Sequence, residues 1–106
     1  MKKTIRIIRK KPGCMAEWIE LPNTLEALQR EVGGYIEILG VTENSCLICN
    51  EEGKLQGLKE NIFYRGDVIV GTILIAGRDG EELDDLPFDD IAAKAYFPSL
   101  FREVKA

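Results

Sequence analysis

Apolar and polar residues alternate at the start of the chain, and this pattern predicts a β-hairpin. Thr4–Lys10 is rich in isoleucine, and Cys14–Leu21 places Trp18 and Leu21 on opposite sides of an extended segment. Between them, Lys11-Pro12-Gly13 favours a type II turn, because proline pre-sets φ and glycine supplies the positive φ that follows. The two segments are therefore expected to pair as antiparallel strands.

A helical spacing follows the hairpin. Asn23 is predicted to cap this helix, and Glu26 stands three residues later, as a capping box requires. Gly33 is predicted to end the helix, because glycine tolerates the left-handed conformation after the last helical residue. The apolar stripe of the helix consists of Leu25, Leu28 and Val32.

Three apolar segments after the helix predict further strands, namely Tyr35–Leu39, Ser45–Asn50 and Val68–Ala76. The short loop Gly40–Asn44 joins the first two, and the long connection Glu51–Asp67 leads to the third. Val68–Ala76 is apolar on both alternations, so this strand is expected to be central, with both faces covered.

The end of the sequence predicts a second helix, from about Pro87 to Phe97, which Pro98 should end or kink. This helix would cover one face of the central strand, and if it does not reach, a second subunit must. Its apolar face is formed by Phe88, Ile91, Ala92 and Ala95. The expected fold is a single α+β domain over residues 1–106. It has a mostly antiparallel five-stranded sheet, one central helix packed on it and a C-terminal helix, in a β-grasp-like order.

Composition limits where the protein acts. No apolar run approaches the roughly 20 residues that a membrane span needs. Lysine and arginine interrupt the first residues too often for a signal peptide. We therefore expect a cytoplasmic protein that does not contact a membrane.

The cysteines favour reduced thiols, because Cys14, Cys46 and Cys49 are an odd number. Cys46 and Cys49 match the C-x-x-C spacing, but on a strand they would point to opposite faces and would not converge on one ion. The chain has no histidine and no second cysteine pair to complete a zinc site. Neither a metal nor another cofactor is expected.

Charge is unevenly distributed around a formal net charge of −4, which argues against general nucleic-acid binding. Residues 1–13 carry six basic residues and no acidic one. They would suit a phosphate-bearing ligand or an acidic partner, although solvated edge-strand lysines are the simpler interpretation. An acidic run near the other end is expected to form a solvated loop and a helix start. Its members are Asp79, Glu81, Glu82, Asp84, Asp85, Asp89 and Asp90.

Four segments resemble the family called domain of unknown function 3846: Thr24–Gln29, Val32–Glu37, Asn50–Lys54 and Gly66–Thr72. The similarity covers about residues 4–80 and leaves the acidic loop and final helix, at about 79–104, outside. The family often has Leu-Pro-x-Asn where this chain has Leu58-Lys59-Glu60-Asn61, without the proline. The resemblance implies no established activity. It implies a short protein of the kind encoded by phages, plasmids and integrated elements.

A binding site is expected mainly in the connection Glu51–Asp67, because long ordered loops are often functional. Tyrosine and arginine in it offer flat surfaces with polar tips. For any one residue there, a structural role such as a turn at Gly53 or capping by Asn61 is favoured over a functional one. The candidate ligand-binding residues are Arg6, Arg9, Lys10, Tyr35, Asn50, Lys54, Asn61, Tyr64 and Arg65.

The sequence favours a binding protein over an enzyme. Without histidine, Ser–His and Cys–His catalytic pairs are excluded, and exposed acids in a run rarely acquire the raised pKa that acid catalysis needs. One hypothesis is an accessory or counter-defence factor that captures a small anionic, nucleotide-type host molecule. The alternative is an acidic module that inhibits a host protein through Asp84, Asp85, Asp89 and Asp90, and a small enzyme of unknown reaction is a third. A homo-oligomer, most simply a dimer, is expected.

Overall fold

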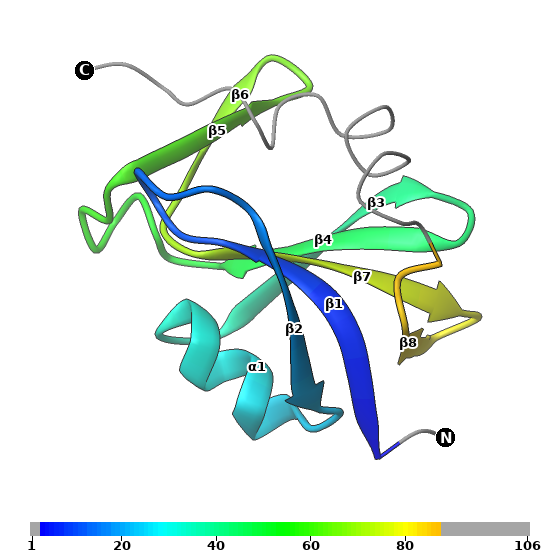
Figure 1. The fold of residues 1–106 in the computed structure, drawn as a ribbon. Helices are drawn as coiled ribbons and strands as arrows, with labels where there is room; N and C mark the ends of the chain where they lie inside the picture. The colour runs from blue at the N-terminus through cyan, green and yellow to red at the C-terminus, as the bar shows by residue number, and fades with distance from the viewer. Residues whose placement is uncertain (1–2, 88–106) are drawn as a thin grey trace.

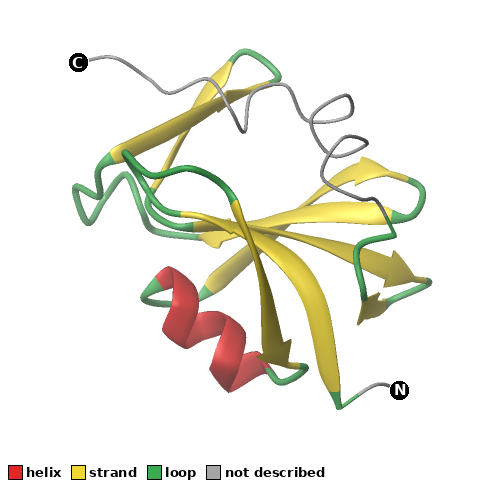
Figure 2. Cartoon of the chain, viewed as in Figure 1, coloured by secondary structure: helices red, strands yellow, loops and turns green. Residues whose placement is uncertain are grey.

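The computed structural model describes residues 3–87, and the elements of this part follow the order of a hairpin, a helix and further strands (Figures 1 and 2). They are β1 (Thr4–Lys10), β2 (Glu17–Pro22), α1 (Leu25–Val32), β3 (Ile36–Thr42), β4 (Ser45–Asn50), β5 (Glu60–Tyr64), β6 (Asp67–Val70), β7 (Ile73–Asp79) and β8 (Glu82–Asp84).

The strands form two sheets, and all their pairings are antiparallel. The larger sheet has six strands in the order β2-β1-β7-β4-β3, with β8 paired to β7 as well, and β5 and β6 form a separate two-stranded sheet. The predicted α+β class, the antiparallel sheet and the first hairpin are confirmed. The predicted count of five strands is wrong, because the long connection contains β5, the acidic run contains β8 and the segment Val68–Ala76 forms two strands, β6 and β7.

The central strand is β7, which lies between β1 and β4. Its residues Ile73–Ala76 are fully buried, so the prediction of a central strand with two covered faces is confirmed for this segment. The apolar run Val68–Ala76 is nevertheless two strands and not one. Gly71 has a φ of 78°, and this left-handed residue ends β6 and redirects the chain into β7.

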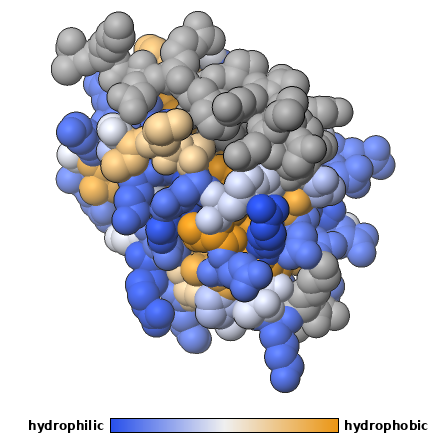
Figure 3. Space-filling view, in the orientation of Figure 1, coloured by the Kyte–Doolittle hydropathy of each residue, from blue (hydrophilic) through white to orange (hydrophobic). Residues whose placement is uncertain are grey.

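Two layers cover the larger sheet, one on each face (Figure 1). Helix α1 contributes Ala27, Leu28 and Val32 to one core, where they pack with Ile48 and Leu74. The β5–β6 hairpin covers the other face. Its residues Ile62 and Ile69 pack in a second core with Ile8, Leu47, Ile73 and Ile75. Most of the described surface in Figure 3 is hydrophilic, as expected when the apolar residues are enclosed between layers.

Helix α1 begins after a threonine cap and ends at a glycine. The residue that caps the helix is Thr24, whose side chain accepts a hydrogen bond from the Ala27 N–H at 3.1 Å, so the assignment of Asn23 as the cap is wrong. Asn23 instead donates its side-chain amide to Leu83 O at 3.4 Å. Gly33 ends the helix with a φ of 79°, as predicted.

Other boundaries differ from the predicted ones for local reasons. The Cys14 N–H bonds to Lys11 O at 3.1 Å and closes the predicted turn, but β2 begins only at Glu17. Strand β3 continues to Thr42 through a bulge, so the loop predicted over Gly40–Asn44 is shorter. Strand β4 has the predicted bounds. The predicted helix from Pro87 to Phe97 lies outside the described residues.

The chain crosses over β7 after β8. A Cβ atom on Gly77 would collide with the Asp85 carbonyl oxygen, so the close approach requires glycine at this position. Beyond the crossing, the Leu86 N–H bonds to Arg6 O at 2.9 Å, and the Leu86 side chain is buried in the core beneath the β5–β6 hairpin.

We predict that Leu74→Asp prevents stable folding. Leu74 is 0% exposed, and truncating a buried leucine already costs about 2–5 kcal/mol before the cost of burying a carboxyl group is added. Leu25→Asp is the control, because Leu25 is 56% exposed at the start of α1. Thermal melting followed by circular dichroism measures both variants. A Leu74→Asp protein that melts near the wild-type temperature would contradict the central placement of β7.

Candidate functional site

A groove lies between the edge strand β3 and the β5–β6 hairpin. Two adjoining hollows of about 200 Å³ and about 270 Å³ form it, and they share Asp67 and Ile69. We call it the β3–β6 groove. Its lining residues are Glu37, Leu39 and Gly40 of β3, Cys49 and Asn50 of β4, Glu51–Leu55 of the following turn, Tyr64 and Arg65, and Asp67–Val70 of β6.

The register of β3 determines which of its backbone groups face away from the sheet. The Glu51 N–H donates to Tyr35 O at 2.8 Å, so the bonded pairs with β4 continue at Glu37 and Leu39. The N–H and C=O groups of the alternate residues, Ile36 and Ile38, therefore point away from β4, towards the open edge. Strand β3 is the last strand of the larger sheet on this side.

The tip of the β5–β6 hairpin reaches this edge at Gly40. Arg65 and Gly66 have φ values of 52° and 78°, which form a two-residue type I′ turn between the paired residues Tyr64 and Asp67. The Tyr64 hydroxyl donates to Gly40 O at 3.2 Å, and Arg65 Nη2 lies 3.4 Å from Val41 O. These side chains occupy backbone acceptors where β3 bulges, so among residues 3–87 the edge is closed there and open at Ile36 and Ile38.

Asp67 lies on the opposite wall of the groove, at the start of β6. Its Oδ1 accepts hydrogen bonds from the Lys54 Nζ and from the Val68 N–H, each at 2.8 Å. The bond from Lys54, followed by that from Val68, lowers the pKa of Asp67. Because the pair of Asp67 and Lys54 is exposed, it adds little to stability and orients two side chains at the groove.

The cysteine in the groove is poorly suited to nucleophilic chemistry. Burial, followed by the nearby Glu37 carboxylate, raises the pKa of Cys49 to about 11, and Cys49 Sγ lies 3.9 Å from Glu37 Oε1. The thiol therefore stays protonated near neutral pH, whereas a nucleophilic cysteine needs the thiolate. Cys46 lies in the core on the opposite face of the sheet, as predicted from its strand spacing, and burial raises its pKa too.

Asn50 and Asn61 are buried and have structural partners. Asn50 Nδ2 donates to Val32 O at 3.1 Å, and its Oδ1 accepts from the Glu52 N–H at 2.8 Å, which organises the turn after β4. Asn61 Oδ1 accepts from the Lys10 Nζ at 2.8 Å. Lys10 is only 1% exposed.

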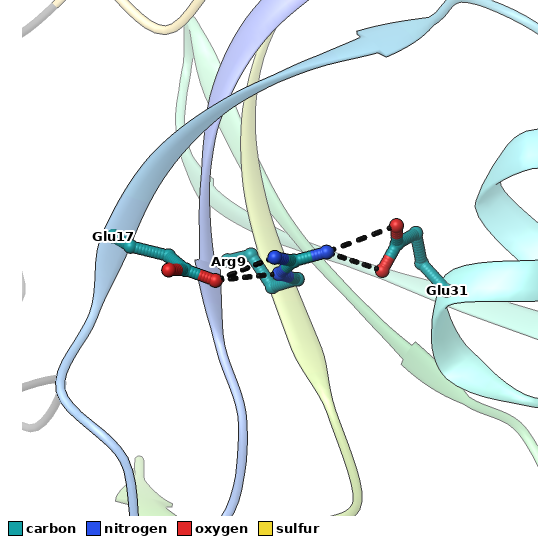
Figure 4. Close-up of polar contacts among 3 residues, drawn as sticks. All are labelled: Arg9, Glu17 and Glu31. Carbon is teal, nitrogen blue, oxygen red and sulfur yellow. Dashed lines mark hydrogen bonds and ion pairs between the residues drawn. The ribbon is translucent and has the colours of Figure 1, made fainter.

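The basic residues of β1 that were predicted to anchor an anion do not converge. The Arg6 guanidinium stacks 3.9 Å from the centre of the Trp18 ring. Arg9 forms ion pairs with Glu17 at 2.6 Å and with Glu31 of α1 at 3.0 Å (Figure 4). These pairs tie β1 to β2 and α1.

The remaining candidates do not line the groove. Tyr35 is 66% exposed in a neighbouring hollow with Arg30 and Glu52, and Glu52 also lines the groove. Asp84 ends β8, and Asp85 Oδ1 accepts a hydrogen bond from the Arg6 N–H at 2.8 Å. Asp89 and Asp90 lie outside the described residues.

The structure thus brings four of the predicted ligand-binding residues to one groove: Asn50, Lys54, Tyr64 and Arg65. The last three lie in the long connection, where a binding site was expected. Sequence reasoning missed Glu37 and the open edge at Ile36 and Ile38. The alternation of isoleucine with glutamate in β3 is typical of a half-exposed strand, but nothing in it distinguishes an edge strand from an inner one.

Over residues 3–87, the structure contains no group of three or more histidine, cysteine, aspartate or glutamate side chains that could hold a metal ion. In the same part of the chain, no helix is long and apolar enough to cross a membrane.

The fold and the groove together describe a small α+β domain with a groove beside the edge strand β3. Residues 5–100 match the family described as "Domain of unknown function (DUF3846)", and the chain belongs to this family. The match extends beyond the 4–80 region in which the resemblance was recognised. The searches of curated proteins and of solved structures found no match.

We predict that the three thiols differ sharply in reactivity. Cys14 is exposed, whereas Cys46 and Cys49 are buried. A disulfide reagent at about pH 8 should modify Cys14 rapidly and the other two only after denaturation. Rapid modification of Cys46 or Cys49 in the folded protein would contradict the described core.

The raised pKa of Cys49 also predicts how stability changes with pH. The unfolded thiol ionises near pH 8.5, below the value of about 11 in the folded protein. The free energy of unfolding should therefore fall as the pH rises through this interval, because the unfolded state loses its proton first. Denaturant titrations of wild type and Cys49→Ala measure the effect. Equal slopes against pH would contradict it.

Proposed function

We propose that the protein is a non-catalytic binding protein and that its binding surface is the β3–β6 groove with the adjoining edge of β3. The observation that carries this proposal is the open backbone edge at Ile36 and Ile38 beside a groove whose cysteine is held in its neutral form. Such an edge supplies hydrogen bonds to an extended segment, which is a recurring mode of peptide recognition.

Charge favours a protein segment over a small anion as the ligand. Glu37, Glu51, Glu52 and Asp67 line the groove, against Lys54 and Arg65. An anionic ligand would meet a wall with more carboxylates than cations. The predicted anchors Arg6 and Arg9 are also held by Trp18, Glu17 and Glu31, and freeing them would cost these contacts.

This proposal keeps the acidic protein-binding hypothesis of the sequence and moves its centre from the acidic run to the groove. In the mobile-element context implied by the family resemblance, the partner would be a host protein. The expected dimer would compete for the same edge, since β3 of a second copy could pair with β3 there.

We predict that extended peptides, and not nucleotides, perturb the groove. Amide spectra of isotope-labelled protein would be recorded against a panel of mono-, di- and cyclic dinucleotides and a panel of extended hexapeptides that vary in charge. Peptides should shift the signals of Gly40, Val68 and Ile69, whereas Gly80, in the turn between β7 and β8, serves as the internal control. Shifts produced by nucleotides around Arg6, Arg9 and Arg65, with peptides silent, would contradict the proposal and favour the capture of a small anion.

A further inference from the structure

We infer that the edge of β3 takes a particular class of partner: an extended segment in which basic residues alternate with β-branched apolar residues. This inference rests on the proposed function and names the chemistry of the ligand. The segment would add to the larger sheet as a strand beside β3.

The backbone of β3 determines the length of the open site. Ile36 and Ile38 each present one N–H and one C=O group outward, so an added strand can form about four backbone hydrogen bonds before it reaches Gly40. At Gly40 the carbonyl oxygen already accepts a bond from the Tyr64 hydroxyl at 3.2 Å. Tyr64 therefore limits the open edge on the side of the hairpin tip.

The side chains of β3 determine the alternation. Glu37 lines the groove, with Glu51 and Glu52 on the neighbouring turn. On the other face of the strand, Ile36 packs against the core beneath α1, and Ile38 is 48% exposed. Residues on an added strand face the same sides as the residues they pair with. Basic side chains would therefore meet Glu37 on the groove side, and apolar side chains would cover Ile38 on the other side.

Charge also separates such a partner from a second copy of the chain. Two β3 edges paired across a two-fold axis would bring two acidic grooves to one interface, and like charges close together weaken association. A basic segment gains from the same carboxylates. We therefore assign the edge to a basic partner and treat self-pairing as an alternative result of the test.

The probe is a fluorescent hexapeptide that alternates lysine and valine. Its controls are a peptide with glutamate in place of lysine and a block peptide that has three lysines followed by three valines. Anisotropy titrations measure the affinities. The alternating basic peptide should bind at least about tenfold more tightly than either control, and added salt should weaken it. Equal affinity for the block peptide would overturn the inference.

Three protein variants locate the peptide on β3. Glu37→Lys should weaken binding by about tenfold or more, while Glu81→Lys, in the turn between β7 and β8, should leave it unchanged. Ile38→Pro removes an outward N–H and should abolish binding. Tyr64→Phe frees the Gly40 carbonyl and should tighten binding several-fold. Because damage to the fold does not tighten binding, this last variant keeps the test valid if Ile38→Pro fails to fold.

Several results would overturn the inference. One is that Glu37→Lys and Tyr64→Phe bind the peptide as the wild type does. Another is that the peptide does not bind, while light scattering shows a dimer that Ile38→Pro dissociates. If peptides of another composition shift the groove signals and the alternating basic peptide does not, only this inference fails. If no peptide shifts them, the proposed function fails as well.

Discussion

The buried side chain of Asn61 joins the two layers of the structure, and the position of the groove depends on it. Asn61 Nδ2 donates to Lys10 O, at the end of β1, and to Gly71 O, at the bend between β6 and β7, each at 2.8 Å. Asn61 Oδ1 accepts from the Lys10 Nζ at the same distance. The register shift at Asn61 is a β-bulge, and it lets Asn61 and its neighbour Ile62 both turn inward. Because a buried polar group left without a partner costs about 1–3 kcal/mol, the hairpin is held where all these groups are satisfied.

Once the hairpin is held over the sheet, the edges of β3 and β6 face the same groove. Side chains occupy some of the outward backbone groups on these edges and leave others open. Asp67 bonds the outward N–H of Val68, and Tyr64 bonds the outward carbonyl of Gly40. Side chains that occupy edge groups discourage indiscriminate pairing. Ile36 and Ile38 lie beyond the reach of these bonds. The same hairpin therefore protects one half of the β3 edge and leaves the other half as the proposed binding surface, where the carboxylate of Glu37 would select the charge of a partner.

The periodicity of the sequence predicted the elements that depend on local pattern. The first hairpin, α1 with its terminal Gly33, the bounds of β4 and the burial of Ile73–Ala76 all follow from spacing and turn chemistry. The split at Gly71 could not be predicted, because apolar residues continue on both sides of it and only its positive φ ends the strand. The site was predicted only in part. Tyr64 and Arg65 lie in the connection that was singled out, but the distinction between an edge strand and an inner strand depends on pairings distant in sequence. For the same reason Arg9, a plausible anion ligand in the sequence, is an ion-pair partner of Glu17 and Glu31 in the fold.

Native-state hydrogen exchange of an Asn61→Ala variant tests most directly whether this side chain holds the hairpin over the sheet. By register, the Ile62 and Ile69 amides bond across the β5–β6 hairpin, and the Ile48 amide bonds to the central strand β7. Asn61→Ala should accelerate exchange at Ile62 and Ile69 at least about tenfold more than at Ile48, because the hairpin loses its anchor while the sheet keeps its own bonds. Asn44→Ala, in the turn between β3 and β4, is the control and should show no such difference. Exchange at Ile62 and Ile69 that is accelerated no more than at Ile48 would contradict the account.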